Sequence, residues 1–170
     1  MKRVLAICLI ALVMLTLTYI SLRETLGGMF LAEGYKDIDS RLSLNGYVPI
    51  KVEVNGNTVR IKYGCYAIDK NVLDGQALSI YHVINNITYF RPLTHDLIKD
   101  MLDLFEIKVK VAKIVDYRDG VYYARLVLER GNKIVDLDAR PSDVIAIALR
   151  YNKSVYIKES IIKENGMYIC

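Results

Sequence analysis

The pattern of hydrophobic positions sets the N-terminal part of the chain apart. Residues 4–22 carry no charge and include 16 apolar side chains. A helix of that length reaches roughly 28 Å at about 1.5 Å per residue, enough to cross a bilayer core. A signal peptide is the alternative, but its apolar stretch is usually about 7–15 residues and ends in a small-residue cleavage site, which is missing here. The run therefore predicts a transmembrane anchor over residues 4–22.

This anchor predicts a single-pass membrane protein. Basic residues flank the run on both sides, and Lys2 and Arg3 lie close to its N-terminal end. By the positive-inside rule this placement favours a domain outside the cytoplasm. The polar stretch 23–46, which contains several glycines, is typical of a tether. The remaining pattern, residues 47–166, predicts one folded domain of ordinary size.

The first half of that domain changes from a strand pattern to a helix pattern. Residues 47–54 and 58–63 alternate on either side of an Asn-Gly-Asn turn and predict a hairpin. Pro49 places the first of these strands at a sheet edge, because proline cannot donate to a ladder. Apolar positions from Leu73 to Ile84 recur with helical spacing, and a second helical pattern follows Pro92.

The second half predicts a meander and a buried helix. Residues 107–111, 122–128 and 133–138 alternate between glycine-containing turns, which predicts three antiparallel strands. Pro141 opens a helix with six consecutive apolar residues, 144–149, and a short strand and a helical turn follow. The predicted class is α+β: an antiparallel sheet with helices, preceded by one transmembrane helix. A strand pair followed by a helix occurs in each half, which suggests a duplicated βαββ-like unit.

Composition and charge narrow the function classes. With 23 basic and 19 acidic residues the net charge is +4, which excludes a polybasic arm but is compatible with a transient nucleic-acid substrate. The sequence contains no P-loop, dinucleotide-binding, serine-hydrolase or zinc-protease motif. Three cysteines are too few for a disulfide scaffold, and we expect Cys65 and Cys170 to be free thiols. The absence of a C-x-x-C pair gives zinc chemistry no support.

The first cluster of candidate chemistry is RPLTHDL, residues 91–97, at the start of the second helix. A histidine beside an aspartate can move protons at a phosphodiester, which makes His95 and Asp96 candidates for general acid–base catalysis. In the alternative, structural interpretation, Thr94 caps the helix, Asp96 offsets the helix dipole and His95 packs. Arg91 is a candidate for holding phosphate oxygens through its guanidinium.

The second cluster is DARPSDVIAIAL, residues 138–149. Period-two spacing places Asp136, Asp138 and Arg140 on one strand face, with the carboxylates about 6.5–7 Å apart. Such a pair can hold a divalent cation such as Mg²⁺, which would activate water, while Arg140 binds phosphate and Asp143 takes part in catalysis. The alternative is a solvated strand face with an ion pair, followed by a helix start in which a proline and an acidic residue suit the first turn.

Together with DYRDGVYYARLVLERG, residues 116–131, these clusters resemble the bifunctional nuclease (BFN) domain family. Both clusters are long and stand in the order that is typical of the family. The resemblance implies an α+β domain that self-associates, with hydrolysis of DNA and RNA in the plant branch of the family. It implies no settled mechanism, so the roles of the residues rest on their own chemistry.

We therefore predict a membrane-anchored nuclease that hydrolyses phosphodiester bonds of DNA or RNA with little sequence preference and forms a homo-oligomer. The alternative is a noncatalytic, membrane-tethered oligomeric scaffold or ligand-binding module, which the mild charge favours. An open cleft shared by both clusters would favour the enzyme, and buried, internally satisfied clusters would favour the scaffold. The candidate residues are His95, Asp96 and Asp143 for catalysis, Arg91 and Arg140 for substrate, and Asp136 and Asp138 for the metal.

Overall fold

The structure, a computed structural model, describes residues 14–19, 21–22 and 38–170, and it separates the chain into a unit of residues 1–41 and a compact unit Leu42–Cys170. The described residues of the first unit are helical. Among the described residues, no helix combines the length and the apolar character needed to cross a membrane, and on this finding we correct the predicted single-pass membrane localisation. Residues 4–13 and 20 of the predicted anchor and residues 23–37 of the predicted tether lie outside the described residues.

The compact unit contains one eight-stranded mixed sheet, with the strand order β6-β5-β4-β7-β1-β2-β3-β8. All neighbouring strands are antiparallel except β4 and β7, which are parallel. The α+β class is confirmed, and the purely antiparallel sheet is corrected, because a helix between β6 and β7 brings the chain back in the direction of β4. The strands are β1 Tyr47–Asn55, β2 Thr58–Tyr63, β3 Tyr66–Asn71, β4 Lys108–Arg118, β5 Val121–Arg130, β6 Lys133–Ala139, β7 Val155–Lys158 and β8 Met167–Tyr168.

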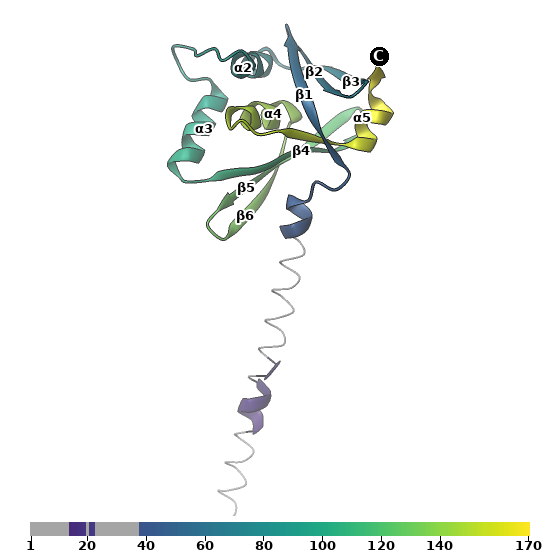
Figure 1. The fold of residues 1–170 in the computed structure, drawn as a ribbon. Helices are drawn as coiled ribbons and strands as arrows, with labels where there is room; N and C mark the ends of the chain where they lie inside the picture. Colours follow the sequence, from purple (N-terminus) through teal and green to yellow (C-terminus); the bar gives the residue numbers. More distant parts are fainter. Residues whose placement is uncertain (1–13, 20, 23–37) are drawn as a thin grey trace, which may run out of the picture. The chain divides into compact units, whose positions relative to one another are not determined.

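Four helices accompany this sheet in the compact unit: α2 Asp74–Ile84, α3 Thr94–Leu104, α4 Pro141–Arg150 and α5 Glu159–Asn165. The three longer helices begin where the sequence predicts them. In α4 the residues from Val144 to Ala148 are buried, as its continuous apolar run predicts. Figure 1 shows α4 among the other elements, with α2 and α3 beside it. The core therefore forms around α4, and the N-termini of α3 and α4 are brought near each other.

Each half of the domain is a three-strand meander followed by a helix: β1, β2, β3 and α2, then β4, β5, β6 and α4. The repeated unit is therefore βββα and not the predicted βαββ. The sequence prediction misses β3 because Ala67 and Ile68 are both buried, which interrupts the alternation. The turn before β3 is also unusual, since Gly64 adopts a φ of +54° ahead of Cys65.

β1, which contains Pro49, lies between β7 and β2 in the sheet, so the predicted edge strand is wrong. β1 pairs with β7 through Tyr47–Ile50 and with β2 through Lys51–Asn55. Pro49 therefore lies in the part of β1 that has one registered neighbour. A proline is tolerated there because the strand is locally an edge.

Cys65 and Cys170 form a disulfide, so the expected free thiols are wrong. Pairing of β8 with β3 brings the two residues together, and the Ile169 N–H donates to the Cys65 carbonyl at 2.9 Å. As a result the two Cα atoms lie 5.2 Å apart despite a sequence separation of 105. A contact of this range follows from sheet pairing and leaves no local pattern in the sequence.

Candidate active site

The two polar clusters meet in space. His95 is the second residue of α3, Asp143 is the third residue of α4, and His95 Nε2 lies 3.3 Å from Asp143 Oδ1. The other ring nitrogen, Nδ1, lies 2.8 Å from Ser79 Oγ of α2. Three helices thus each contribute one side chain to a single hydrogen-bonded chain.

The hydrogen-bond partners determine where the proton of His95 lies. Arg150 can only donate, and its NH2 group lies 2.9 Å from Ser79 Oγ, so this oxygen accepts. The Asp143 carboxylate can only accept, so Nε2 carries the hydrogen of the neutral imidazole and the Ser79 hydroxyl donates to Nδ1. Nε2–H donates to Asp143 Oδ1, the same oxygen that accepts from Gln76 Nε2 at 3.0 Å. Two donors therefore hold one oxygen of Asp143, and the other oxygen makes no hydrogen bond to a described residue.

Burial keeps His95 neutral. The ring lies among α2, α3 and α4, and desolvation lowers its pKa below the ordinary 6.5. The Asp143 carboxylate opposes this shift and the Arg150 guanidinium adds to it. A neutral His95 fits the deduced tautomer, because an imidazolium would need both nitrogens to donate and the Ser79 hydroxyl would have to turn away.

Asp96 belongs to the same network but faces Arg150. Its Oδ1 accepts from Arg150 Nε at 2.7 Å, and its Oδ2 accepts from the Leu93 N–H at 2.8 Å. Burial of the carboxyl acts to raise its pKa, but these hydrogen bonds outweigh it and lower the pKa below 3.8. Both oxygens accept hydrogen bonds, so Asp96 fixes the start of α3 to the end of α4, and its catalytic role stays a prediction.

His95 and Asp143 open onto a cleft. The cleft encloses about 690 Å³, and its wall includes His95, Asp138 and Asp143 with apolar side chains of α2, α3, β5 and β6. The Asp143 side chain is 31% exposed and that of His95 is 8% exposed. Asp143 is therefore the member of the pair that a bound molecule can reach, with His95 behind it.

Asp136 and Asp138, the predicted metal ligands, both lie on β6. Asp138 Oδ1 lies 4.0 Å from Arg125 Nε. Burial lowers the pKa of Lys113, and the nearby Asp136 carboxylate partly opposes this shift. Within the described residues there is no group of three or more His, Cys, Asp or Glu side chains that could hold a metal. Each carboxylate has a basic neighbour, Arg125 for Asp138 and Lys113 for Asp136. The role of the pair in binding Mg²⁺ stays a prediction.

The two predicted phosphate ligands lie outside this cleft wall. Arg140 is the residue before α4 and lines a second cavity, and Arg91 is an exposed residue three positions before α3. In the described residues neither guanidinium forms an ion pair. The structure thus unites His95, Asp138 and Asp143 on one cleft, whose wall includes neither arginine.

Gln76, Ser79 and Arg150 belong to the site but are not among the residues predicted from the sequence. Gln76 and Ser79 are three residues apart and so share one face of α2, while Arg150 lies two helical turns after Asp143 and shares its face of α4. A polar stripe on an otherwise apolar helix is the signal that could have found them. Its partner helices could not be named, because side chains that meet across helices have no fixed spacing along the chain.

Known proteins share the segment that carries this site. The model of the bifunctional nuclease domain matches residues 71–169, more than half of the chain. A Mycobacterium tuberculosis (strain ATCC 25618 / H37Rv) protein described as uncharacterized is 42% identical over 79 residues, which is 46% of either chain. "Bifunctional nuclease 1" of Oryza sativa subsp. indica is 28% identical over 101 residues, which is 58% of this chain and 30% of the relative. "Bifunctional nuclease 2" of Arabidopsis thaliana is also 28% identical over 101 residues, which is 58% of this chain and 31% of the relative.

The match leaves part of every such relative uncovered. The chain spans about half the length of the mycobacterial protein and less than a third of the plant proteins. The matched segment nevertheless includes both polar clusters, the His95–Asp143 pair and the helices that hold them. The chain belongs to the bifunctional nuclease domain family.

Proposed function

We propose that the chain is a nuclease that hydrolyses phosphodiester bonds of DNA or RNA, with little sequence preference, at the cleft of His95 and Asp143. The observation that carries this proposal is the 3.3 Å contact between the two residues, which joins the two polar clusters at the wall of a cleft. The names of the plant relatives support the reaction class. No base-reading element is part of the proposal, which is why little sequence preference is expected.

In this proposal Asp143 is the general base. Gln76 and His95 hold its Oδ1, and its Oδ2 has no hydrogen-bond partner among the described residues. Oδ2 takes a proton from a water molecule as the water oxygen bonds to phosphorus, and the bond from phosphorus to the leaving sugar oxygen breaks. Solvent returns a proton to the leaving oxygen. His95 is then a positioning residue, since its Nε2–H is committed to Asp143.

Substrate phosphate would lie near the start of α3. Arg91 precedes this helix, and the side chain of the N-cap residue, Leu93, accepts no hydrogen bond from the amides of the first turn. A guanidinium and helix N-terminal amides are both suited to an anion. Arg91 is therefore assigned to the phosphate backbone, a contact that carries no sequence information.

We also propose that the chain self-associates through the outer face of α3. The exposed side chains Leu97, Met101 and Leu104 follow each other at helical spacing, while Ile98 and Leu102 of the same helix face the core. Phe90, four residues before α3, is 87% exposed. A second copy of the chain would remove this apolar stripe from water, which is the favoured outcome for contiguous exposed apolar surface.

A noncatalytic ligand-binding module is the second candidate function. This candidate is supported by the hydrogen bonds of the network: both ring nitrogens of His95 and the Nε of Arg150 have a partner within the fold. A network of this kind can serve stability alone. The same variants distinguish the two functions, because stability and cleavage are measured separately.

The test is a nuclease assay on the purified chain with single- and double-stranded DNA and RNA, run with Mg²⁺ and with chelator. Asp143→Asn keeps the shape of the side chain and should lower cleavage by roughly 10²–10⁴. His95→Gln should lower it by about 10–100, because it misplaces Asp143. The matched control is Asp100→Asn, an exposed acid on α3, which should keep wild-type cleavage.

Melting curves accompany every assay. Loss of cleavage in Asp143→Asn with a melting temperature close to that of the wild type supports the enzyme. Cleavage by Asp143→Asn equal to the wild type, per folded molecule, would refute the catalytic assignment. Unfolding of the variant without a specific loss of cleavage would favour the noncatalytic module.

A further inference from the structure

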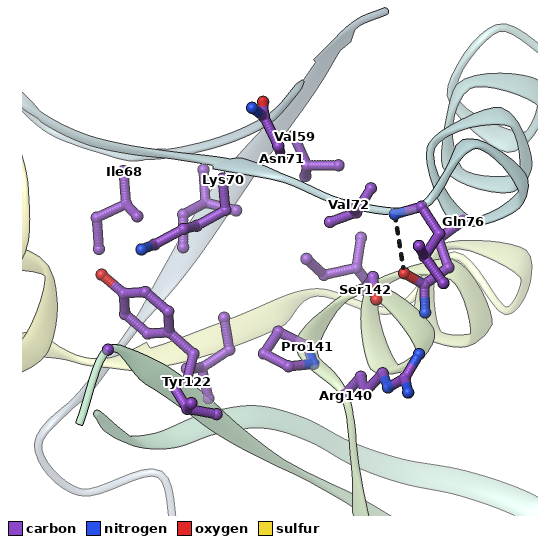
Figure 2. Close-up of a pocket in the computed structure, with 16 residues that line it drawn as sticks. Val59, Ile68, Lys70, Asn71, Val72, Gln76, Tyr122, Arg140, Pro141 and Ser142 are labelled. Atoms are coloured by element: carbon purple, nitrogen blue, oxygen red, sulfur yellow. Dashed lines mark hydrogen bonds between the residues drawn. The ribbon is translucent and has the colours of Figure 1, made fainter. Parts of the chain in front are cut away.

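A second cavity lies on the other side of Gln76, between the first meander and the N-terminus of α4. It encloses about 520 Å³. Figure 2 shows Lys70 with Tyr122 on one side of it, and Arg140 with Gln76 on the other, with Pro141 and Ser142 between them. Its wall contains neither His95 nor Asp143, so it is distinct from the cleft described above. A volume of this size suits a small organic molecule.

The inner wall of this cavity is aliphatic. It is formed by core side chains of β2, β3, β4 and α4, namely Val59, Ile61, Ile68, Ile114 and Ile145. Water needs two to four polar partners to be held in a buried space, and these side chains supply none. The inner part of the cavity therefore favours an apolar group.

The N-terminus of α4 supplies polar groups at the edge of the cavity. No side chain caps this helix, and Pro141 is its first residue. Ser142 is only 6% exposed and lines the cavity, and its hydroxyl makes no hydrogen bond to any residue the structure describes. This hydroxyl can be reached from the cavity and can donate to a bound molecule.

Two cations border the same opening. Arg140, next to the helix N-terminus, forms no ion pair in the described part of the chain. Lys70 Nζ lies 5.3 Å from the centre of the Tyr122 ring, and the structure describes no carboxylate partner for it. A positive helix end, a guanidinium and an ammonium around an apolar cavity suit a molecule with a negative head and an apolar body.

We propose that this cavity binds an organic anion with an apolar body, whose carboxylate or phosphate group lies against Arg140, the Ser142 hydroxyl and the α4 N-terminus. The hydrocarbon or aromatic body fills the aliphatic interior beneath Lys70 and Tyr122. The proposal does not depend on the nuclease function, since neither Asp143 nor His95 nor Arg91 lines the cavity, although Gln76, which holds Asp143, lines both spaces. A nucleotide is the less suited occupant, because its sugar and base would place many polar groups against aliphatic walls.

The first experiment is calorimetric titration of the full chain with defined probes below their micelle concentrations. Decanoate and decyl phosphate carry an anion on an alkyl chain, 1-decanol lacks the charge, inorganic phosphate lacks the apolar body, and adenosine monophosphate tests a nucleotide. We expect one site per chain for the two alkyl anions, and comparison of these two identifies the preferred headgroup. Binding of 1-decanol and inorganic phosphate should be at least tenfold weaker. Equal binding of decanol, several sites per chain, or preference for the nucleotide would overturn the proposal.

The second experiment locates the site with variants. Arg140→Ala and Ser142→Ala should each weaken decanoate binding, the former by about five- to tenfold, as expected for one lost charge-assisted contact. Arg130→Ala removes an exposed arginine at the far end of β5 and is the matched control. Val121→Trp enlarges a half-exposed side chain at the cavity edge and should block binding without disturbing the core. Wild-type decanoate affinity in folded Val121→Trp and Arg140→Ala would refute the site, and melting curves establish that each variant is folded.

Discussion

Arg150 donates from Nε to Asp96 Oδ1 at 2.7 Å, although only 5% of the Arg150 side chain is exposed. The same guanidinium also donates to Ser79 Oγ and to the Ala146 carbonyl. One side chain at the end of α4 thus holds the beginning of α3 and the middle of α2. The geometry between His95 and Asp143 depends on this contact, because it sets how α3 lies against α4.

Replacing Arg150 should destabilise the fold and change the titration of His95. Arg150→Met keeps much of the side-chain volume but leaves Asp96 and Ser79 without their donor. We expect the free energy of unfolding to fall by about 2–4 kcal/mol, measured by urea denaturation. The pKa of His95 should rise, since the Arg150 charge lowers it, and NMR titration of the His95 ring would show this.

Lys163→Ala is the control for that variant, because it breaks an exposed pair between Lys163 and Glu159 within α5. Surface pairs of this kind contribute little to stability, so its denaturation midpoint should stay close to that of the wild type. A loss in Arg150→Met no larger than in Lys163→Ala would contradict the structural role of Arg150.

The stability of the fold should decrease as the pH is lowered through a window that the pKa of His95 sets. Its folded pKa lies below the ordinary 6.5, so between these two values the unfolded chain binds a proton that the folded chain does not. The contribution of His95 to the free energy of unfolding is therefore fully present above about pH 6.5. It decreases as the pH falls toward the folded pKa, by at most about 1.4 kcal/mol per pH unit. Urea denaturation at a series of pH values measures this slope.

His95→Gln should flatten the slope in that window. Asp96 acts in a separate window, because its lowered pKa makes its contribution disappear only below about its ordinary 3.8. The charged groups that face His95 from α4 are Asp143 and Arg150. An unchanged slope in His95→Gln would show that another group is responsible.

Reduction of the disulfide should destabilise the compact unit. The Cys65–Cys170 bond closes a loop with a sequence separation of 105, and cross-links of this span restrict the unfolded chain strongly. We expect Cys65→Ser and Cys170→Ser each to cost about 2–5 kcal/mol in denaturation under oxidising conditions, and to behave alike. A non-reducing peptide map would show the linked peptides, and equal stability of both variants and the oxidised wild type would contradict the prediction.

Self-association should depend on the α3 stripe. Leu97→Lys and Leu104→Lys place charges on exposed positions and should shift the sedimentation profile of the chain toward the monomer. Lys110→Ala, on the exposed part of β4, is a control that should leave the profile unchanged. A wild-type chain that sediments only as monomer at tens of micromolar would refute self-association.

The local pattern of the sequence predicts the elements whose signal lies within a few residues. The helices α2, α3 and α4 and the meander β4–β6 follow from periodicity and turn residues, since these properties depend on neighbours along the chain. The importance of the RPLTHDL and DARPSDV clusters is also visible, because polar side chains at helix starts stand out beside apolar runs.

Contacts between distant segments are decided by the tertiary structure alone. Sheet order places β7 parallel to β4, pairs Cys65 with Cys170, and assigns Arg125 to Asp138, and none of these pairings has a local signal. Helix packing likewise brings Ser79 and Arg150 to His95 and leaves Arg140 at a different cavity. The sequence determines which faces of each element are apolar or polar, but only the packing of those faces fixes which polar groups meet, because burial selects partners by position in space and not by separation along the chain.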